Sequence, residues 1–275
     1  MTAATATTVT APTPVPTTPS RSKLGWAVSD TLAIAGRNLR AMQRVPEVIV
    51  FSTIQPVLFV LMFRYAFGGA INVPGVRYVD YLMPGIFAQT VAFGSINTGV
   101  GLADDLGKGL IERFRSLPMA RSAVLAGRTI ADLVRDLGVI ILMIVVGFLV
   151  GFRIHTNVGA FGVTILLLLM FAFALAWVFA FIGLSAPNSE AAQAASFPPL
   201  ALITFASSAF VPLRSQPGWL QVFSAHQPLT ITVNAVRALV LGGPTLTPVL
   251  QSMAWSIGIV AVFAPIAVAR YRRAA

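Results

Sequence analysis

The residues best suited to binding a partner lie at 104–121, in a charged interval between two apolar segments. Leu106, Leu110, Phe114 and Leu117 follow at spacings of four, four and three, which places them on one face of a helix that Pro118 ends. The charged residues lie mostly off that face: Asp104, Asp105, Lys108, Glu112, Arg113 and Arg115. A short amphipathic helix of this kind could dock a soluble protein. Basic loops also occur on the cytoplasmic side of any membrane protein, so both interpretations stay open on these residues alone.

Residues that could do chemistry are scarce elsewhere. His155 and His226 fall in separate predicted outer segments, where hydrogen bonding is their expected role. The pair Gly107-Lys108 does not form a phosphate-binding loop, because Gly109 stands where that loop needs Ser or Thr. We expect no catalytic, cofactor-binding or metal-binding residue in this chain. Any ATP and Mg²⁺ would be bound by another polypeptide.

The composition is that of an integral membrane protein. Of 275 residues, 56% are hydrophobic and 10% are charged, and the mean hydropathy is +0.82. Soluble domains carry about a quarter charged residues. The net charge of +10 would suggest nucleic acid in a soluble protein, but here the basic residues flank apolar segments, so anionic lipids are the expected partner and nucleic acid is not.

The chain divides into three parts. Residues 1–22 are a Thr/Pro-rich tail that we expect to be disordered. Residues 23–46 predict an amphipathic helix in the cytoplasmic membrane interface. Residues 47–273 predict an all-α membrane domain with six transmembrane helices, each near the ~20 residues that cross a bilayer. The predicted spans are about 48–67, 82–103, 130–152 (its helix beginning upstream near Ser122), 158–184, 191–213 and 249–269.

The basic residues orient these spans. Lys and Arg number 19, and all but five fall in the two terminal segments or at 104–135. The positive-inside rule therefore predicts that both termini and the 104–135 loop are cytoplasmic. The five on the other side are Arg64, Arg77, Arg153, Arg214 and Arg237. The span interiors contain almost no ionisable residues, which argues against a proton- or sodium-coupled transporter.

The segment between spans five and six, residues 214–248, is the longest predicted outer segment. Pro217 and Trp219 open an amphipathic piece, Pro228 interrupts it, and residues 229–241 are apolar enough to dip into the membrane. Two short re-entrant helices fit this pattern, as does an ordinary surface loop anchored by Trp219. At span five, Glu190-Ala191-Ala192 resembles the start of an importer docking motif whose remainder is absent. Capping by Asn188 or Ser189 is the interpretation we adopt there.

Two stretches resemble one protein family. Gly109-Leu-Ile-Glu-Arg-Phe-Arg-Ser-Leu-Pro118, followed by Arg121-Ser-Ala-Val-Leu-Ala-Gly-Arg128, resembles the first cytoplasmic loop of type-2 ABC exporter permeases. Val211-Pro-Leu213, Pro217-Gly-Trp-Leu220, Gln227-Pro-Leu-Thr230 and Ala235-Val-Arg-Ala-Leu239 resemble their last outer loop. The combination looks like the daunorubicin/doxorubicin-resistance branch, which includes actinobacterial polyketide-lipid exporters. The resemblance covers about residues 37–273.

That resemblance implies a transporter subunit, not an enzyme, in the bacterial cell membrane. Two permeases, identical or related, would pair above two ATPase subunits that bind ATP and Mg²⁺. In the coupling loop, Glu112, Arg113 and Arg115 would make polar contacts with the ATPase, and Leu110, Phe114 and Leu117 would pack on it. Pro217, Trp219, Pro228 and Arg237 would belong to the outer gate. The cargo would be an amphipathic, hydrophobic drug or lipid.

Two alternatives remain open at this stage. A polysaccharide- or glycolipid-exporting permease of the same superfamily would differ only in its cargo. A lipid scramblase or membrane scaffold without an ATPase would be a different class of protein, and it would not need the loop at 104–121.

Overall fold

Helix is the only regular structure in the part of the chain that this computed structural model describes. That part comprises residues 29, 31, 35–36, 46–71, 73–109 and 121–274, with the backbone alone at 46–52, 121–126 and 274. The elements are α2 (Pro46–Leu61), the π-helix η1 (Met62–Ala66), α3 (Tyr78–Gly107), α5 (Arg121–Leu149), α6 (Val158–Gly183), α7 (Ser189–Phe205), the 3₁₀ turn η2 (Leu213–Ser215), α8 (Gly218–His226), α9 (Pro228–Leu241) and α10 (Leu246–Ala274).

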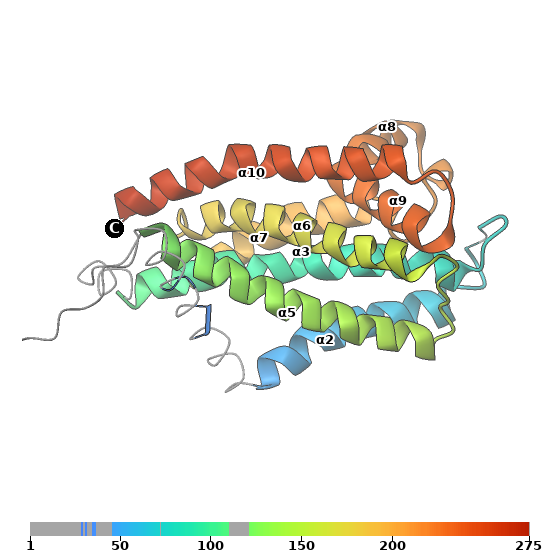
Figure 1. Ribbon diagram of the computed structural model, residues 1–275, viewed down its shortest axis with the longest axis horizontal. Coiled ribbons are helices and arrows are strands. Elements are labelled where there is room, and N and C mark those ends of the chain that lie inside the picture. The colour runs from blue at the N-terminus through green and yellow to red at the C-terminus, as the bar shows by residue number, and fades with distance from the viewer. Residues whose placement is uncertain are drawn as a thin grey trace, which may run out of the picture.

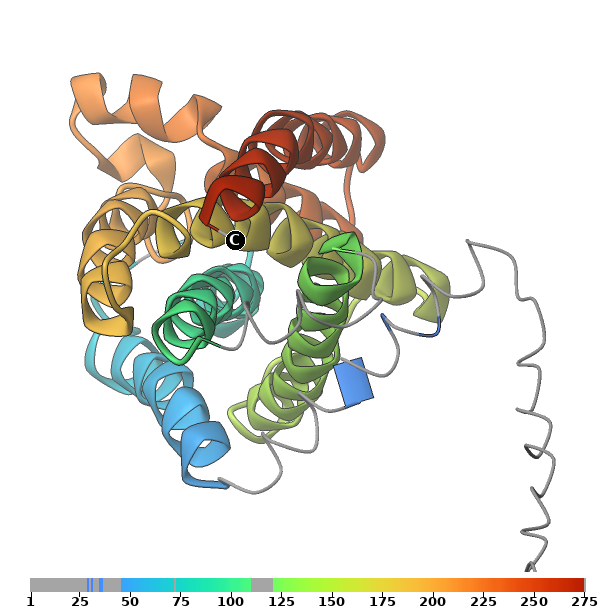
Figure 2. The same ribbon diagram turned by 90° about the vertical axis from the view of Figure 1, so that its left-hand side faces the viewer.

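The longer helices run side by side along the molecule's long axis (Figure 1). At one end of the molecule lie the last turns of α3 and α10 and the first turn of α5, and we call it the C-terminal end. The opposite end, where α8 and α9 lie, we call the α8 end. Viewed along this axis, α3 lies in the middle, with α2, α5, α6 and α7 around it and α10 outside α6 (Figure 2). Of the apolar 18-residue stretch in each helix, 72% is buried in α3 and only 17% in α10. α3 is therefore the core helix and α10 is peripheral.

Helices occupy each of the six ranges in which the sequence predicts a span, and the all-helical class is confirmed. By length and composition, three helices of the described chain can cross a membrane: α3, α6 and α10. Shorter apolar helices lie at Thr53–Ala66 and Pro228–Leu241. α5 is 29 residues long and carries charged side chains within its predicted span. Six crossings and cytoplasmic termini stay predictions, and the tail at 1–22 and most of the helix at 23–46 lie outside the described residues.

Two helix ends differ from the limits of the predicted ranges. The first four residues of the predicted docking helix, 104–107, form the last turn of α3. Leu106 packs there against the same buried cluster to which Leu102, one turn earlier, belongs. The helix ends where Lys108 donates its backbone N–H to Asp104 and Gly109 adopts a positive φ of 63°. α7 ends at Phe205, well before residue 213, and the chain continues in a buried turn.

The start of α7 confirms the capping interpretation. The Asn188 side chain accepts a hydrogen bond of 2.7 Å from the backbone N–H of Ala191. Replacing Asn188 with Ala should lower the free energy of unfolding by about 1 kcal/mol, because that N–H loses its acceptor. Thermal unfolding in detergent measures the change. Gln193→Ala, at an exposed position on the same helix, is the matched control and should be close to neutral.

Two glycines let the backbones of α3 and α6 lie close together. A Cβ added at Gly183 would overlap the backbone of Gly99, and one added at Gly99 would overlap the backbone of Phe179. Ser95, one turn away, donates a hydrogen bond of 3.1 Å to the carbonyl of Ala172 across the same interface. Small residues that let helix backbones meet are a common way to pack helices in a membrane. This crossing fixes α6 against the core helix.

Candidate functional site

The predicted coupling residues, Leu110, Glu112, Arg113, Phe114, Arg115 and Leu117, lie outside the described residues. The structure does describe the two helices on either side of them in the chain, α3 and α5. α3 leads into this segment, and Lys108 at its end forms an ion pair of 2.6 Å with Asp104. The hydrogen bond from Lys108 to Asp104, together with the carboxylate charge, raises the pKa of Lys108. α5 resumes at Arg121.

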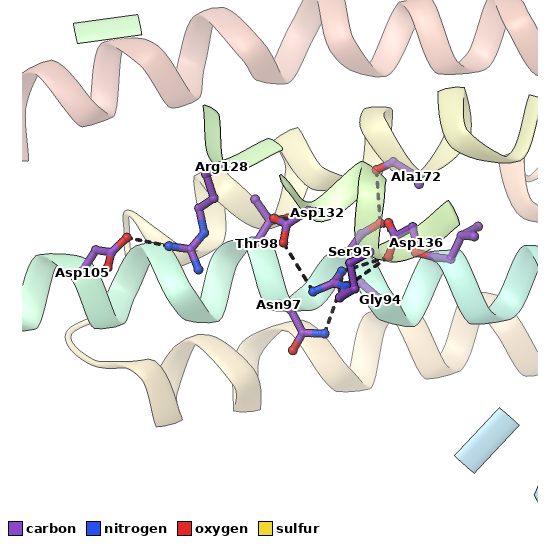
Figure 3. Close-up of polar contacts among 11 residues, drawn as sticks. Gly94, Ser95, Asn97, Thr98, Asp105, Arg128, Asp132, Asp136 and Ala172 are labelled. Atoms are coloured by element: carbon purple, nitrogen blue, oxygen red, sulfur yellow. Dashed lines mark hydrogen bonds and ion pairs between the residues drawn. The ribbon is translucent and has the colours of Figure 1, made fainter. Parts of the chain in front are cut away.

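Polar side chains join α3 to α5 along the half of each helix nearest this segment (Figure 3). Arg128 forms an ion pair of 2.5 Å with Asp105. Thr98 donates a hydrogen bond of 2.5 Å to Asp132. We call this set the α3–α5 ladder: Gly94, Thr98, Gly101 and Asp105 on α3, with Arg128, Asp132, Arg135 and Asp136 on α5.

Arg135 holds the third rung of the ladder. Its guanidinium donates to the carbonyl of Gly94 at 2.7 Å and to Asp136 at 3.0 Å, and it lies 3.4 Å from Asp132. The side chains of Arg135, Asp132 and Asp136 are only 10%, 11% and 5% exposed. Charges buried to this degree are retained only when they are paired, because each loses most of its hydration.

Glycines on α3 make room for these charged groups. A Cβ at Gly101 would overlap the Arg128 guanidinium, and one at Gly94 would come within 2.8 Å of Asp136 Oδ1. The α3 residues of the ladder are spaced four, three and four apart. The same spacing on α5 joins three ladder residues, Arg128, Asp132 and Arg135, and continues to Val139. Each set therefore forms one face of its helix.

Sequence reasoning missed this ladder. It counted Arg128 and Arg135 as cytoplasmic surface charges, although Asp132, Arg135 and Asp136 fall inside the predicted span 130–152. Three charges within an apolar span were the available signal, since such residues usually face other helices and pair with one another.

A second polar cluster lies at the α8 end, around the buried turn at 206–210. Each carbonyl of this turn accepts a hydrogen bond from a side chain far away in the sequence. The donors are Ser224 and Gln227 to residue 206, Gln216 to 207, Tyr81 and Arg237 to 208, Arg237 to 209, and Tyr78 to 210. Buried backbone outside helices needs such partners, because water is excluded.

Arg237 contributes most to that cluster. Its Nη2 donates to the carbonyls of Ser208 and Ala209 at 2.5 and 3.1 Å, and its Nε donates to the carbonyl of Tyr81 at 3.0 Å. The guanidinium also lies 3.5 Å from the centroid of the Tyr81 ring, within the range of a cation–π interaction. Nη1 donates to Ser208 Oγ and Asn234. With its donors occupied, Arg237 anchors α9 to α3 and the turn.

The four residues predicted for the outer gate do not meet in one place. Pro217 precedes α8 and Pro228 is the first residue of α9, so the two predicted short helices are present. Trp219 on α8 is 76% exposed, whereas Arg237 points into the turn and α3. Whether α8 and α9 re-enter a membrane stays a prediction.

The α3–α5 ladder and the contacts around the turn at 206–210 hold helices against one another. Among the described residues, no three His, Asp or Glu side chains are grouped so as to hold a metal ion. The long apolar helices and the buried polar contacts between them define a multi-pass membrane protein.

Comparison with known proteins gives the family. Residues 29–241 match the model of the ABC-2 type transporter family, and the chain belongs to that family. A daunorubicin resistance ABC transporter permease of Streptomyces coeruleorubidus is 34% identical over 90% of this chain and 87% of its own length. A probable doxorubicin resistance ABC transporter permease of Mycobacterium tuberculosis is 29% identical over 96% of this chain and 95% of its own length. A putative transport permease of Cyanophora paradoxa is 24% identical over 77% and 74%. The predicted resemblance is confirmed, and these relatives are named as transporter permeases.

Proposed function

We propose that this chain is the membrane-spanning permease subunit of an ATP-driven exporter, and that it moves an amphipathic, hydrophobic drug-like compound out of the cell. One observation carries the proposal. Two relatives that align over nearly the whole chain are named as daunorubicin and doxorubicin resistance permeases. The expected cargo is therefore a compound of the class to which these two drugs belong.

The apolar helices support a cargo of this kind. α6, for example, has no charged residue in its 26 residues. A path lined by such helices would bind a compound through buried hydrophobic area and would offer few fixed counter-ions.

Energy would come from a separate subunit. Two ATPase subunits would bind ATP and Mg²⁺ beneath a pair of permeases, identical or related, and would contact residues 110–117. The charge distribution supports placing this side in the bacterial cytoplasm. The C-terminal end carries Lys108 near the end of α3, and Arg270, Arg272 and Arg273 near the end of α10. Positive residues of this kind favour the inner side of a membrane.

Site-specific crosslinking tests the ATPase contact. The chain has no cysteine, so Glu112→Cys introduces a single thiol. In native membranes, a thiol crosslinker at this position should capture an ATPase subunit, with a yield that changes when ATP is added. Arg214→Cys, exposed at the α8 end, is the matched control and should capture none. Transport that continues while Glu112→Cys captures only lipid would refute the docking of an ATPase here.

Drug accumulation in whole cells tests the expected cargo. Cells that express the permease with its ATPase should accumulate less doxorubicin, measured by its fluorescence, than cells lacking the permease. Equal accumulation, with the ATPase crosslink intact, would reject this drug class and leave ATP-driven transport of another compound.

A further inference from the structure

The α3–α5 ladder lies next to the segment that connects α3 to α5. Its rungs join the two helices that lead into and out of residues 110–120, and Asp105 with Arg128 is the rung nearest that segment. From Asp105 to Gly94 the ladder follows α3 for about 16 Å, at 1.5 Å per residue. The chain connects this segment directly to the end of α3 and the start of α5, so a displacement of it acts first on these two helices.

The ladder also sets how α3 and α5 can slide. A shift of one helical turn in either direction would carry Arg128 about 5.4 Å along α3 and would leave the Asp105 carboxylate without its partner. The same shift would move Asp132 away from Thr98, its hydroxyl donor. Buried polar pairs that match in only one register are known to fix how helices align. Apolar packing alone would not resist sliding in this way.

Movement apart is opposed as well. Arg135 is bonded both to α3, through the carbonyl of Gly94, and to the two carboxylates of its own helix. Separating the helices would leave this guanidinium without its acceptor on α3. Thr98 would at the same time leave Asp132. The Arg135 guanidinium and the Thr98 hydroxyl are shielded from water that could replace these bonds, because both side chains are about nine-tenths buried or more.

We propose that the ladder makes α3 and α5 a single lever, and that Asp105 and Arg128 are the positioning residues that make a displacement at the end of α3 or the start of α5 move both helices together. This inference rests on the proposed function. The inference adds to the proposed function by naming the residues that determine how efficiently ATP hydrolysis drives transport.

The test compares molecules transported per ATP hydrolysed, in liposomes that contain the permease with its ATPase. A purely structural role would lower transport and ATP hydrolysis together and leave this ratio unchanged. We expect Asp105→Arg and Arg128→Asp each to lower the ratio by about fivefold or more, the lower end of typical coupling between linked sites. The double exchange should restore it, because the opposite charges face each other again.

Two further variants separate charge from geometry. Gly101→Ala keeps every charge, but its methyl group would displace the Arg128 guanidinium, so the ratio should fall here too. Val134→Ala, at an exposed position of α5 away from the ladder, is the matched control and should leave the ratio unchanged. An unchanged ratio in both single charge variants would overturn the proposal.

A crosslink tests the lever directly. Asp105→Cys with Arg128→Cys removes the rung and should lower the ratio, and a short bifunctional thiol reagent that joins the two cysteines should restore it. If the crosslinked protein hydrolyses ATP without transport, the helices must part during the cycle and the proposal fails.

A third measurement does not depend on transport. Spin labels at Asn97→Cys on α3 and Val134→Cys on α5, both exposed positions, report the distance between the helices. We expect a narrow distribution that broadens when Arg128→Asp is added and narrows again in the double exchange. If the unmodified complex transports nothing, the proposed function fails, and these distances still decide on the ladder. A distribution equally broad with and without Arg128→Asp would refute it.

Discussion

A single methyl group at Gly183 should prevent α3 and α6 from packing. The Cβ of Gly183→Ala would overlap the carbonyl carbon and oxygen of Gly99, and its distance to the Cα of Gly99 would be 2.7 Å. These are backbone atoms, so no side chain can turn aside to make room. Overpacking a core commonly costs about 1–3 kcal/mol, and we expect at least about 3 kcal/mol where two backbones collide. Gly99→Ala, which meets the backbone of Phe179, should have a similar effect.

The measurement is the yield and thermal stability of the detergent-solubilised protein. Gly162→Ala is the matched control, since it lies on the same helix and a Cβ there meets nothing within 4 Å. It should behave as the unmodified protein does. If Gly183→Ala were as stable as Gly162→Ala, the close crossing of α3 and α6 would be wrong.

Replacing Arg237 should release α9 from the rest of the α8 end. In Arg237→Ala the carbonyl of Ala209 loses its side-chain donor, and the cation–π contact with Tyr81 is lost. A buried acceptor left without a partner costs about 1–3 kcal/mol, so we expect the free energy of unfolding to fall by at least about 2 kcal/mol once lost packing is added. Thermal unfolding in detergent measures the loss.

Arg237→Lys separates charge from geometry. It keeps the positive charge, but an ammonium group offers only three donors from one atom and cannot reach the carbonyls of Tyr81, Ser208 and Ala209 together. We therefore expect Lys to destabilise the protein much as Ala does. Arg214→Ala, which removes an exposed arginine at the α8 end, should change little. Full stability in Arg237→Lys would mean that charge alone, and not the arrangement of donors, holds α9.

The sequence predicts where the helices lie because hydrophobicity is a local property. The Asn188 cap and the Pro228 helix start follow equally local rules, and both are present. α7 ends before the limit of the predicted range, and residues 206–210 form a buried turn instead. Side chains from outside this turn donate hydrogen bonds to its carbonyls, and hydropathy does not report such donors.

The α3–α5 ladder could not be derived from either helix separately. Asp105 and Arg128 are 23 residues apart, and which face of α5 meets α3 depends on the packing of the whole bundle. Counting Lys and Arg to orient the chain also treats every arginine as a surface charge. Gly94 and Gly101 look unremarkable in sequence. Their role becomes clear only when the groups they admit are in place.

Ribosomal synthesis delivers the turn at 206–210 to the membrane before most of its hydrogen-bond donors exist. Tyr78 and Tyr81 have already been made, but Gln216, Ser224, Gln227 and Arg237 emerge later. Until they do, the carbonyls of Ala206, Ser207 and Ala209 lack these partners, and exposing such groups to lipid is costly. α7 must therefore remain close to water or within the insertion machinery until α9 arrives. Residues 216–237 complete a part of the molecule that was synthesised before them, so a nascent chain released early would carry an unfinished helix end into the bilayer.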